Sequence, residues 1–444
     1  MKNTFLTLLV ICITALSYGQ SETNTYSLDE AIAFALENNY SVINANRDIE
    51  DAQKQKWETI ATGLPQISGS VSYQNQLKQP VSLLPAEFFG GVAGTFQEII
   101  FGQPQTMNAS AVIKQQLFDG SYIVGVQATK AFLDYSANNK EKTDLDIRKA
   151  VVEAYGNVLL AEESATILES NRATLAKNLE ETQKIFENGL GEEESVEQLQ
   201  ITLSSIENQL KNAIRLKKIT VQMLNLIMGI SIDSPTQLSE NLDVLTQKQI
   251  DYGLLDSQLN ISNNVDYKLV ANLNQQRYYE LKLAKSRALP TLNAFLNYGS
   301  SAYSDGFDFL KSEQKWFDSS VLGFDLHIPI FSSLGRSAST QRAKIAFDKA
   351  KTQLTEAEEQ IRLQLENTKS NYTLAIEEYE TTKKNLNLAE RIEKKNEIKY
   401  FEGMASSFEL RQAQIQLYAT QQEYLQSMVN VINRKTELEI ILNN

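Results

Sequence analysis

LPQISGSVSY occupies residues 64–73, and LPTLNAFLNY occupies residues 289–298. Both stretches open on Leu-Pro and end on Tyr, and between these points apolar or small side chains mostly alternate with polar ones. Such a period of two predicts a strand with two different faces, and the proline predicts the end of a preceding helix. Because the same pattern stands in both halves of a 444-residue chain, it indicates a duplicated architecture.

The duplication extends over most of the chain. Further pairs at nearly constant spacing are Asn39 and Asn264, Gly189 and Gly403, and Gln198 and Gln412. A repeat of this length is too long for a solenoid unit. We therefore predict a first structural repeat at residues 20–229, a linker at 230–262 and a second repeat at 263–444.

The first 19 residues have the pattern of a secretory signal peptide. Lys2 precedes an apolar stretch, small residues precede Gln20, and the only cysteine, Cys12, lies within the apolar stretch rather than at a lipid-anchor site. No other apolar run is long enough to span a membrane as a helix, so any membrane crossing is expected to use strands. The acidic net charge of −13 argues against nucleic acid as a partner.

Four segments alternate as half-buried strands would, at about 66–77, 107–118, 291–300 and 320–331. Asp325 and His327 would be costly against lipid, so their side is expected to face a wet lumen, as in a transmembrane β-barrel. Four strands cannot close a barrel alone; a homotrimer would supply twelve. Strands of a soluble domain are the alternative interpretation.

Long helices are predicted elsewhere, because Pro and Gly are almost absent from 126–188, 192–228, 336–402 and 404–442. Ile361, Leu365 and Thr368 begin a heptad seam of mixed side-chain size, typical of helices curved into a cylinder or of an ordinary antiparallel coiled coil. Gly189 and Gly403 are expected at the turns between these helices, in the left-handed conformation. Residues 78–107 are expected to be an irregular apolar loop, most simply a collapsed lid; folding over the barrel mouth or binding another outer-membrane component are the alternatives.

Motifs for catalysis are absent from the sequence. His327 is the single histidine, and no metal cluster, nucleophilic triad, phosphate-binding loop or dinucleotide fingerprint is present. We therefore predict that the chain is not an enzyme and needs no cofactor or metal.

Several short motifs, in order over both halves, resemble the TolC-like outer membrane efflux proteins. These are Ser27-Leu28-Asp29-Glu30-Ala31, Leu64-Pro65-Gln66-Ile67, Leu117-Phe118-Asp119-Gly120, Leu289-Pro290, Pro329-Ile330-Phe331 and Glu409-Leu410-Arg411-Gln412-Ala413-Gln414. The resemblance implies a mainly α fold with a small β part. Long antiparallel helical hairpins would form one third of a trimeric α-barrel, and four strands would join a 12-stranded transmembrane β-barrel.

The resemblance also implies a function and a location. The chain would be a passive exit duct in the outer membrane of a Gram-negative bacterium, contacting outer-membrane lipid, with its helices in the periplasm. It would serve a tripartite efflux or type I secretion system, docking on a periplasmic adaptor (membrane fusion) protein and an inner-membrane pump of the RND or ABC type. A non-conducting structural or adhesive coiled coil in the periplasm is the alternative.

Matching the family's helical tip places six residues at a candidate gate: Gly189, Ser195, Tyr400, Gly403, Glu409 and Gln412. Glu409 falls where acidic residues ring the entrance, and Tyr400 matches a tyrosine that latches the closed tip. Ser195 and Ala405 stand where that tyrosine's charged partners would be expected, so a charged latch is not predicted here.

Overall fold

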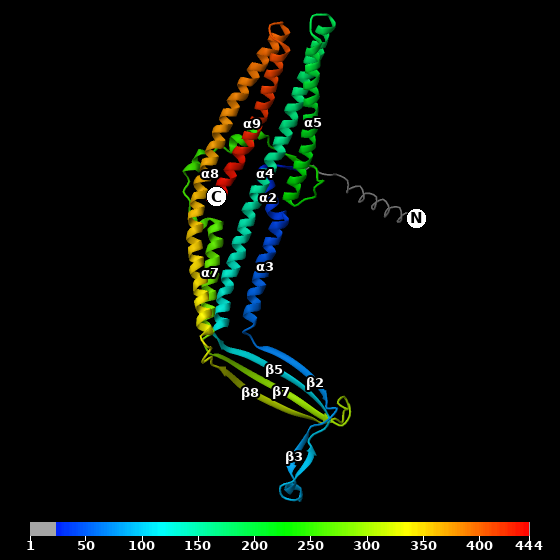
Figure 1. The fold of residues 1–444 in the computed structure, drawn as a ribbon, viewed down its shortest axis with the longest axis vertical. Helices are drawn as coiled ribbons and strands as arrows, with labels where there is room; N and C mark the ends of the chain where they lie inside the picture. Colours follow the sequence, from blue (N-terminus) through cyan, green and yellow to red (C-terminus); the bar gives the residue numbers. More distant parts are fainter. Residues whose placement is uncertain (1–23, 444) are drawn as a thin grey trace, which may run out of the picture. The chain divides into compact units, whose positions relative to one another are not determined.

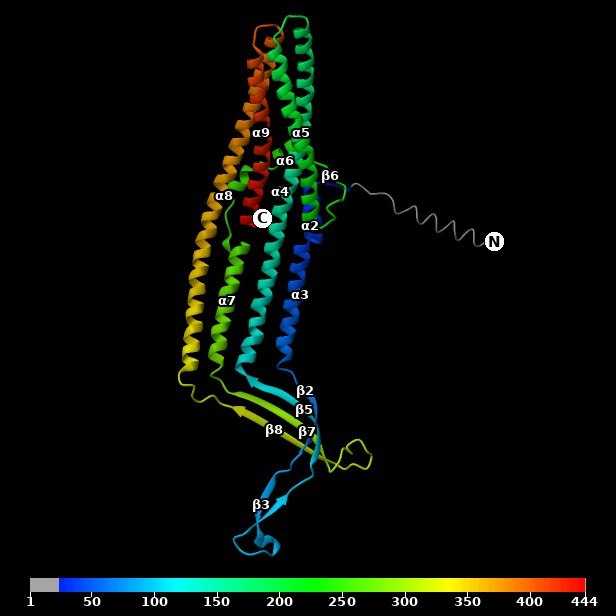
Figure 2. The ribbon, with the colours of Figure 1, turned by 45° about the vertical axis from the view of Figure 1, so that its right-hand side comes forward.

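The computed structural model describes residues 24–443 (Figures 1 and 2). The predicted signal peptide at residues 1–19 lies outside the described residues. The chain forms two compact units, of which one contains Glu50–Tyr135 and Asn272–Thr352, and the other contains the remaining described residues.

A four-stranded antiparallel sheet dominates the unit of Glu50–Tyr135 and Asn272–Thr352, with the strand order β2-β5-β7-β8. The strands are β2 (Gln66–Asn75), β5 (Gln105–Asp119), β7 (Thr291–Ser304) and β8 (Trp316–His327). Within this unit, the adjoining parts of helices α3 (Tyr40–Ala61), α4 (Gly120–Glu187), α7 (Val265–Ser286) and α8 (Gly335–Phe401) lie side by side in the same order as the strands they join (Figure 2). The two halves of the chain thus supply two neighbouring strands each.

The last predicted strand is displaced toward the N-terminus. The alternation suggested 320–331, whereas β8 spans Trp316–His327 and pairs Thr291 with His327 at its end. Ile328 and Ile330 continue the apolar alternation but lie outside the strand. Pro329 lacks a backbone N–H and therefore cannot extend the ladder of hydrogen bonds.

The expectation of an irregular loop at 78–107 is wrong, whereas its role at the barrel mouth stays a prediction. This segment forms an antiparallel hairpin of β3 (Val81–Pro85) and β4 (Phe96–Ile100), with a short 3-10 helix η1 (Ala86–Phe89) at its tip. Figure 2 shows this hairpin extending beyond the end of the four-stranded sheet. Pro80 and Pro85 do not interrupt the hydrogen bonds of the hairpin, because Pro85 is the last residue of β3 and Pro80 precedes the strand.

Two helical hairpins dominate the other unit (Figure 1). Helix α4 turns into α5 (Glu193–Met228), and α8 turns into α9 (Ser407–Leu442). The predicted heptad seam of α8 is buried, with Tyr372 fully inaccessible and Ile361, Leu365, Thr368, Ala375 and Tyr379 nearly so. In the first hairpin, Leu199, Leu203, Ile206 and Leu210 of α5 are buried in a cluster with Leu168 and Leu175 of α4.

Asn39 and Asn264 recur at the same place in the two halves, and each closes its half by linking the ends of two helices. The Asn39 side chain donates to the Ile227 carbonyl at the end of α5 (2.7 Å) and accepts from the Ser41 backbone N–H at the start of α3 (2.7 Å). Asn264 likewise donates to Ile441 (3.0 Å) at the end of α9 and accepts from Asp266 (3.0 Å). A buried amide that satisfies groups at two helix ends explains why this residue recurs.

The chain start and the linker form small elements around this core. Strand β1 (Asn24–Tyr26) pairs in parallel with β6 (Thr236–Leu238), and α2 (Leu28–Asn38) begins with the predicted capping box of Ser27 and Glu30. The linker also contains α6 (Leu242–Lys248) and the 3-10 turns η2 (Tyr252–Asp256) and η3 (Ile261–Asn263). The Tyr372 hydroxyl anchors it, donating to the Gln249 carbonyl (2.8 Å) and accepting from the Asp251 N–H (2.9 Å).

Candidate functional site at the helical tips and the sheet

Both helical hairpins turn on a glycine, as predicted. Gly189 has φ 75° and Gly403 has φ 73°, in the left-handed region where a side chain would be strained. Each turn is closed by backbone hydrogen bonds, from Gly189 to the Phe186 carbonyl (2.8 Å) and from Gly403 to the Tyr400 carbonyl (3.0 Å). The glycines therefore set the turn geometry and contribute no functional side chain.

Tyr400 links the two hairpins. Its hydroxyl lies 3.2 Å from the hydroxyl of Thr182 on α4, and its ring packs edge-on against Phe401. Sequence reasoning looked for the partner at Ser195 and Ala405 and missed Thr182. The distance of each residue from its turn glycine was the one indication in the sequence. Thr182 lies on α4 seven residues before Gly189, and Tyr400 lies three residues before Gly403.

Glu409 is engaged with its own helix end. Its carboxylate accepts from the Ser406 backbone N–H at 2.8 Å, while the Ser406 hydroxyl accepts from the Glu409 N–H, which completes a capping box at the start of α9. These bonds from the Ser406 backbone and hydroxyl lower the pKa of the Glu409 carboxyl. Gln412 is exposed one turn later, and Ser195 is half-buried near the start of α5. A part for these three residues in a gate stays a prediction.

Polar side chains are buried between the two hairpins below the tips. Asn178 on α4 donates weakly to Glu397 on α8 (3.5 Å), and Asn171 donates to Gln421 on α9 (2.8 Å). Gln414 is fully buried, and neither polar atom of its amide makes a hydrogen bond of good geometry within the described chain. Burial raises the pKa of the nearby Glu393 carboxyl, and the charge of Glu397 adds to this rise, whereas the Gln414 amide and Lys394 act against it.

The sheet presents two chemically different faces. Because side chains alternate along each strand and the register aligns them across strands, one face collects large apolar residues. These are Ile67, Val71, Tyr73, Ile113, Leu296, Tyr298, Leu322, Phe324 and Leu326, all of which are exposed. The other face collects Ser68, Ser70, Ser72, Asn108, Ser110, Lys114, Asn293, Asn297 and Asp325. An exposed apolar surface of this extent requires a partner or a lipid phase.

Some residues depart from this division. Asp318 lies on the apolar face toward the end of the sheet, where it accepts a hydrogen bond from Ser300 at 2.6 Å. Phe295 lies on the polar face and covers Gly323 of β8, where a Cβ would approach the ring to 2.4 Å. The predicted placement of Asp325 and His327 opposite the apolar side is confirmed by their pairing with Asn293 and Thr291.

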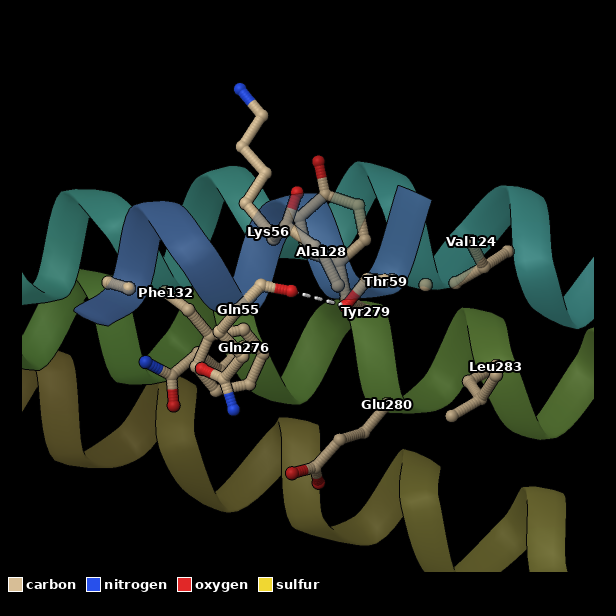
Figure 3. Close-up of a pocket in the computed structure, with 13 residues that line it drawn as sticks. Gln55, Lys56, Thr59, Val124, Ala128, Phe132, Gln276, Tyr279, Glu280 and Leu283 are labelled. Carbon is tan, nitrogen blue, oxygen red and sulfur yellow. Dashed lines mark hydrogen bonds between the residues drawn. The ribbon is translucent and has the colours of Figure 1, made fainter. Parts of the chain in front are cut away.

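A crevice lies between α3, α4 and α7 near the sheet (Figure 3). It encloses about 280 Å³, and Val124, Phe132 and Leu283 make its lining largely apolar. Figure 3 shows the Lys56 and Glu280 side chains extending in opposite directions, and Glu280 is paired with Arg277 at 2.7 Å. The crevice therefore offers shape and apolar contact but no convergent catalytic groups.

Between residues 24 and 443, no three His, Cys, Asp or Glu side chains are grouped in a way that could hold a metal ion. None of the helices described has a stretch long and apolar enough to cross a membrane.

Comparison with known protein families identifies the family of this chain. Residues 31–230 and 260–444 match the model of the family described as outer membrane efflux protein. The chain belongs to the outer membrane efflux protein family. None of the curated proteins compared with it matches.

Solved structures of outer membrane channels share the fold of this efflux protein. The outer membrane protein VceC of Vibrio cholerae superposes with a TM-score of 0.71 at 16% identity, over 94% of this chain and 96% of that one. The Campylobacter jejuni CmeC outer membrane channel gives 0.72 at 17%, over 96% and 90%. The open state of the Neisseria gonorrhoeae MtrE outer membrane channel gives 0.71 at 17%, over 94% and 89%.

Membership in the efflux family assigns the location. The protein resides in the outer membrane of a Gram-negative bacterium and is an outer membrane efflux channel by family.

Proposed function

We propose that this efflux protein works as a passive homotrimeric duct. Three copies would join their sheets into a 12-stranded barrel in the outer membrane, and their helical hairpins would line a periplasmic passage. The observation that carries the proposal is the four-stranded sheet with one apolar exposed face and one polar face. Lipid on the first face and water on the second is the arrangement expected of barrel strands.

The outer strands support assembly from several copies. In the described chain β2 pairs only with β5, and β8 pairs only with β7, so both outer edges carry unpaired backbone groups. Unpaired edges cannot remain within a bilayer, because no water is available to satisfy them. Pairing β8 of one copy with β2 of the next removes all edges when the ring closes, and family membership favours three copies.

The helices carry a second surface for a neighbouring copy. On α5, Leu216, Ile219, Met223 and Leu226 follow one another by three or four residues, and all four are about half exposed. This row lies apart from the buried seam of Leu199 to Leu210, which already packs on α4. A heptad row that stays half exposed in the described chain fits an interface with another helix of the assembly.

The tips would form the entrance and the docking end. Identical copies would repeat Glu409 and Gln412 around the symmetry axis, and Tyr400 and Thr182 would hold the two hairpins of each copy together. A periplasmic adaptor protein and an inner-membrane pump of the RND or ABC type are the proposed partners. The pump would supply the energy, because the chain has no nucleotide-binding motif.

The first test is whether the apolar face is needed for membrane assembly. Leu296→Asp combined with Leu326→Asp places two carboxylates on that face, and we expect loss of the protein from the outer-membrane fraction. The matched control is Asn293→Asp combined with Asn297→Asp, which adds the same charges to the polar face of β7. Normal assembly of the first variant would refute the barrel.

The second test is the duct itself. The purified protein in detergent is expected to have the mass of a trimer and to produce small, stable, cation-selective steps in a planar bilayer. A monomeric mass would refute the assembly. A trimer that stays silent both in the wild type and in a Tyr400→Phe variant would favour a non-conducting structural role.

A further inference from the structure

The β3–β4 hairpin has an uncovered apolar face. The register pairs Val81 with Ile100 and Pro85 with Phe96, which places these residues on one side of the hairpin. Phe96 is 66% exposed, and Val81 and Ile100 are about half exposed. Phe88 and Phe89 add two more exposed rings at the tip. The described chain covers none of these side chains.

The hairpin nevertheless has a defined conformation that hydrogen bonds hold in place. The Ala86 N–H donates to the Thr95 carbonyl at 2.9 Å, the Glu87 carboxylate accepts from the Gly94 N–H at 3.2 Å, and Gly90 closes the 3-10 turn in the left-handed conformation. These bonds fix the shape of the tip. A two-stranded hairpin is marginal in water on its own, so a defined hairpin with an apolar face calls for a surface to pack on.

The hairpin also continues the edge of the sheet. The Gln76 N–H donates to the Pro104 carbonyl at 2.8 Å, and the Gln79 side chain donates to the Gly102 carbonyl at 3.1 Å, which bridges the ladder of β2 and β5 to that of β3 and β4. Strand β2 is the edge at which, in the proposed assembly, a neighbouring copy would pair. The hairpin therefore rises directly from the proposed interface between copies.

The length of the arm allows it to reach the centre of the barrel mouth. Twelve strands about 4.8 Å apart and tilted by about 40° form a ring with a radius of roughly 12 Å. The arm from Gln76 to Pro85 spans about 30 Å at about 3.3 Å per residue. Three such arms, one from each copy, can meet over the mouth.

The geometry points to a cap formed by second and third copies of this same hairpin. We infer that the three β3–β4 hairpins pack their apolar faces on one another at the end of the barrel opposite the helices. The contact centres on Phe96 and the tip rings, because Glu98 on the same face must remain in water. This inference rests on the proposed trimeric duct.

A cysteine placed on the contact face tests the cap. In the full-length protein, purified as the wild type is, Phe96→Cys under mild oxidation is expected to give disulfide-linked dimers, since two of three cysteines at a three-fold axis can pair. Disulfides need Cα atoms within about 7 Å, so only converging hairpins qualify. Gln97→Cys, the next residue on the opposite face of β4, is the matched control and should cross-link about five-fold less.

Each outcome has a distinct meaning. A monomeric wild type would overturn the proposed function and the cap together, whereas a trimer with equal cross-linking at both positions would overturn the cap alone. If a fluorophore attached in Phe96→Cys is quenched by brominated phosphatidylcholine vesicles, the face lies on lipid and the cap is also overturned. Should Phe96→Cys fail to assemble, Phe88→Cys at the tip replaces it against the same control.

Discussion

The two halves of the chain build the same sequence of elements but finish it differently. In the first half, α5 ends on Gly229, whose left-handed backbone approaches the Asn38 carbonyl so closely that a Cβ would lie 2.1 Å from the oxygen. In the second half, α9 ends on Asn443, also left-handed, whose side chain donates to the corresponding Asn263 carbonyl at 2.9 Å. The same junction is closed by contact in one half and by a hydrogen bond in the other, so at this position the two halves share the backbone geometry but not the side chain.

The largest effect is expected at Gly229, where the Asn38 carbonyl leaves no space for a Cβ atom. Gly229→Ala should destabilise the protein by about 3 kcal/mol or more, because left-handed strain adds to a clash with backbone that cannot move away easily. Asn443→Gly, the corresponding change in the other half, loses two hydrogen bonds, to the Asn263 carbonyl and to the Glu141 carboxylate. It should cost about 1 kcal/mol, because relief of the left-handed backbone offsets part of this loss. Thermal unfolding of both variants in detergent measures the contrast. Equal losses would mean that the two junctions are equivalent after all.

The shared asparagine should matter equally in both halves. Asn39→Ala and Asn264→Ala each leave a helix-end carbonyl and a helix-start N–H without their partner, so each should cost about 2 kcal/mol. Urea unfolding of the two single variants and of the double variant measures this. Because the residues lie in different halves, we expect the two losses to add. A loss in only one half would contradict the equivalence of the two closures.

The two tips differ in how their second helix begins. Helix α9 begins with the capping box of Ser406 and Glu409, whereas Glu192 before α5 makes no side-chain cap. Ser406→Ala should therefore cost about 1 kcal/mol and speed hydrogen exchange in the first turn of α9. Glu192→Ala is the control and should leave exchange at the start of α5 nearly unchanged. Similar acceleration at both tips would show that the box is dispensable.

The smallest effect concerns one half-buried acid, Glu393, that the first half lacks. Counting back from the tip glycines, Leu179 occupies in α4 the position that Glu393 occupies in α8. Burial raises the pKa of Glu393, so the charged form weakens the fold near neutral pH and this penalty disappears as the pH falls through the raised pKa. Glu393→Gln should therefore raise the melting temperature at pH 7 by a few degrees and change it little at pH 4. A gain of the same size at both pH values would exclude protonation as its cause.

Much of the fold is readable from the sequence because it depends on periodicity. Alternating side chains located the four strands of the sheet, and the scarcity of Pro and Gly located the long helices. Gly189 and Gly403 marked the turns because few other residues adopt the left-handed conformation. The family resemblance rested on short motifs that occur in order over both halves, and the match to the efflux family confirms it.

What the sequence did not reveal depends on contacts between distant residues. The hydrogen bond between Thr182 and Tyr400 joins residues on two different hairpins, and neither residue type by itself predicts such a contact. The β3–β4 hairpin was misjudged because its strands are short and prolines border it, which resembles a loop locally.

The asparagine closures have a consequence for how the molecule can be divided. Asn39 and the carbonyl it binds at Ile227 both precede the linker, and Asn264 and Ile441 both follow it. A cut in the linker would therefore sever neither closure. A split version expressed as two polypeptides would therefore keep both asparagine closures, and its halves would have to reassociate through the pairing of β5 with β7 and the contacts between the two hairpins.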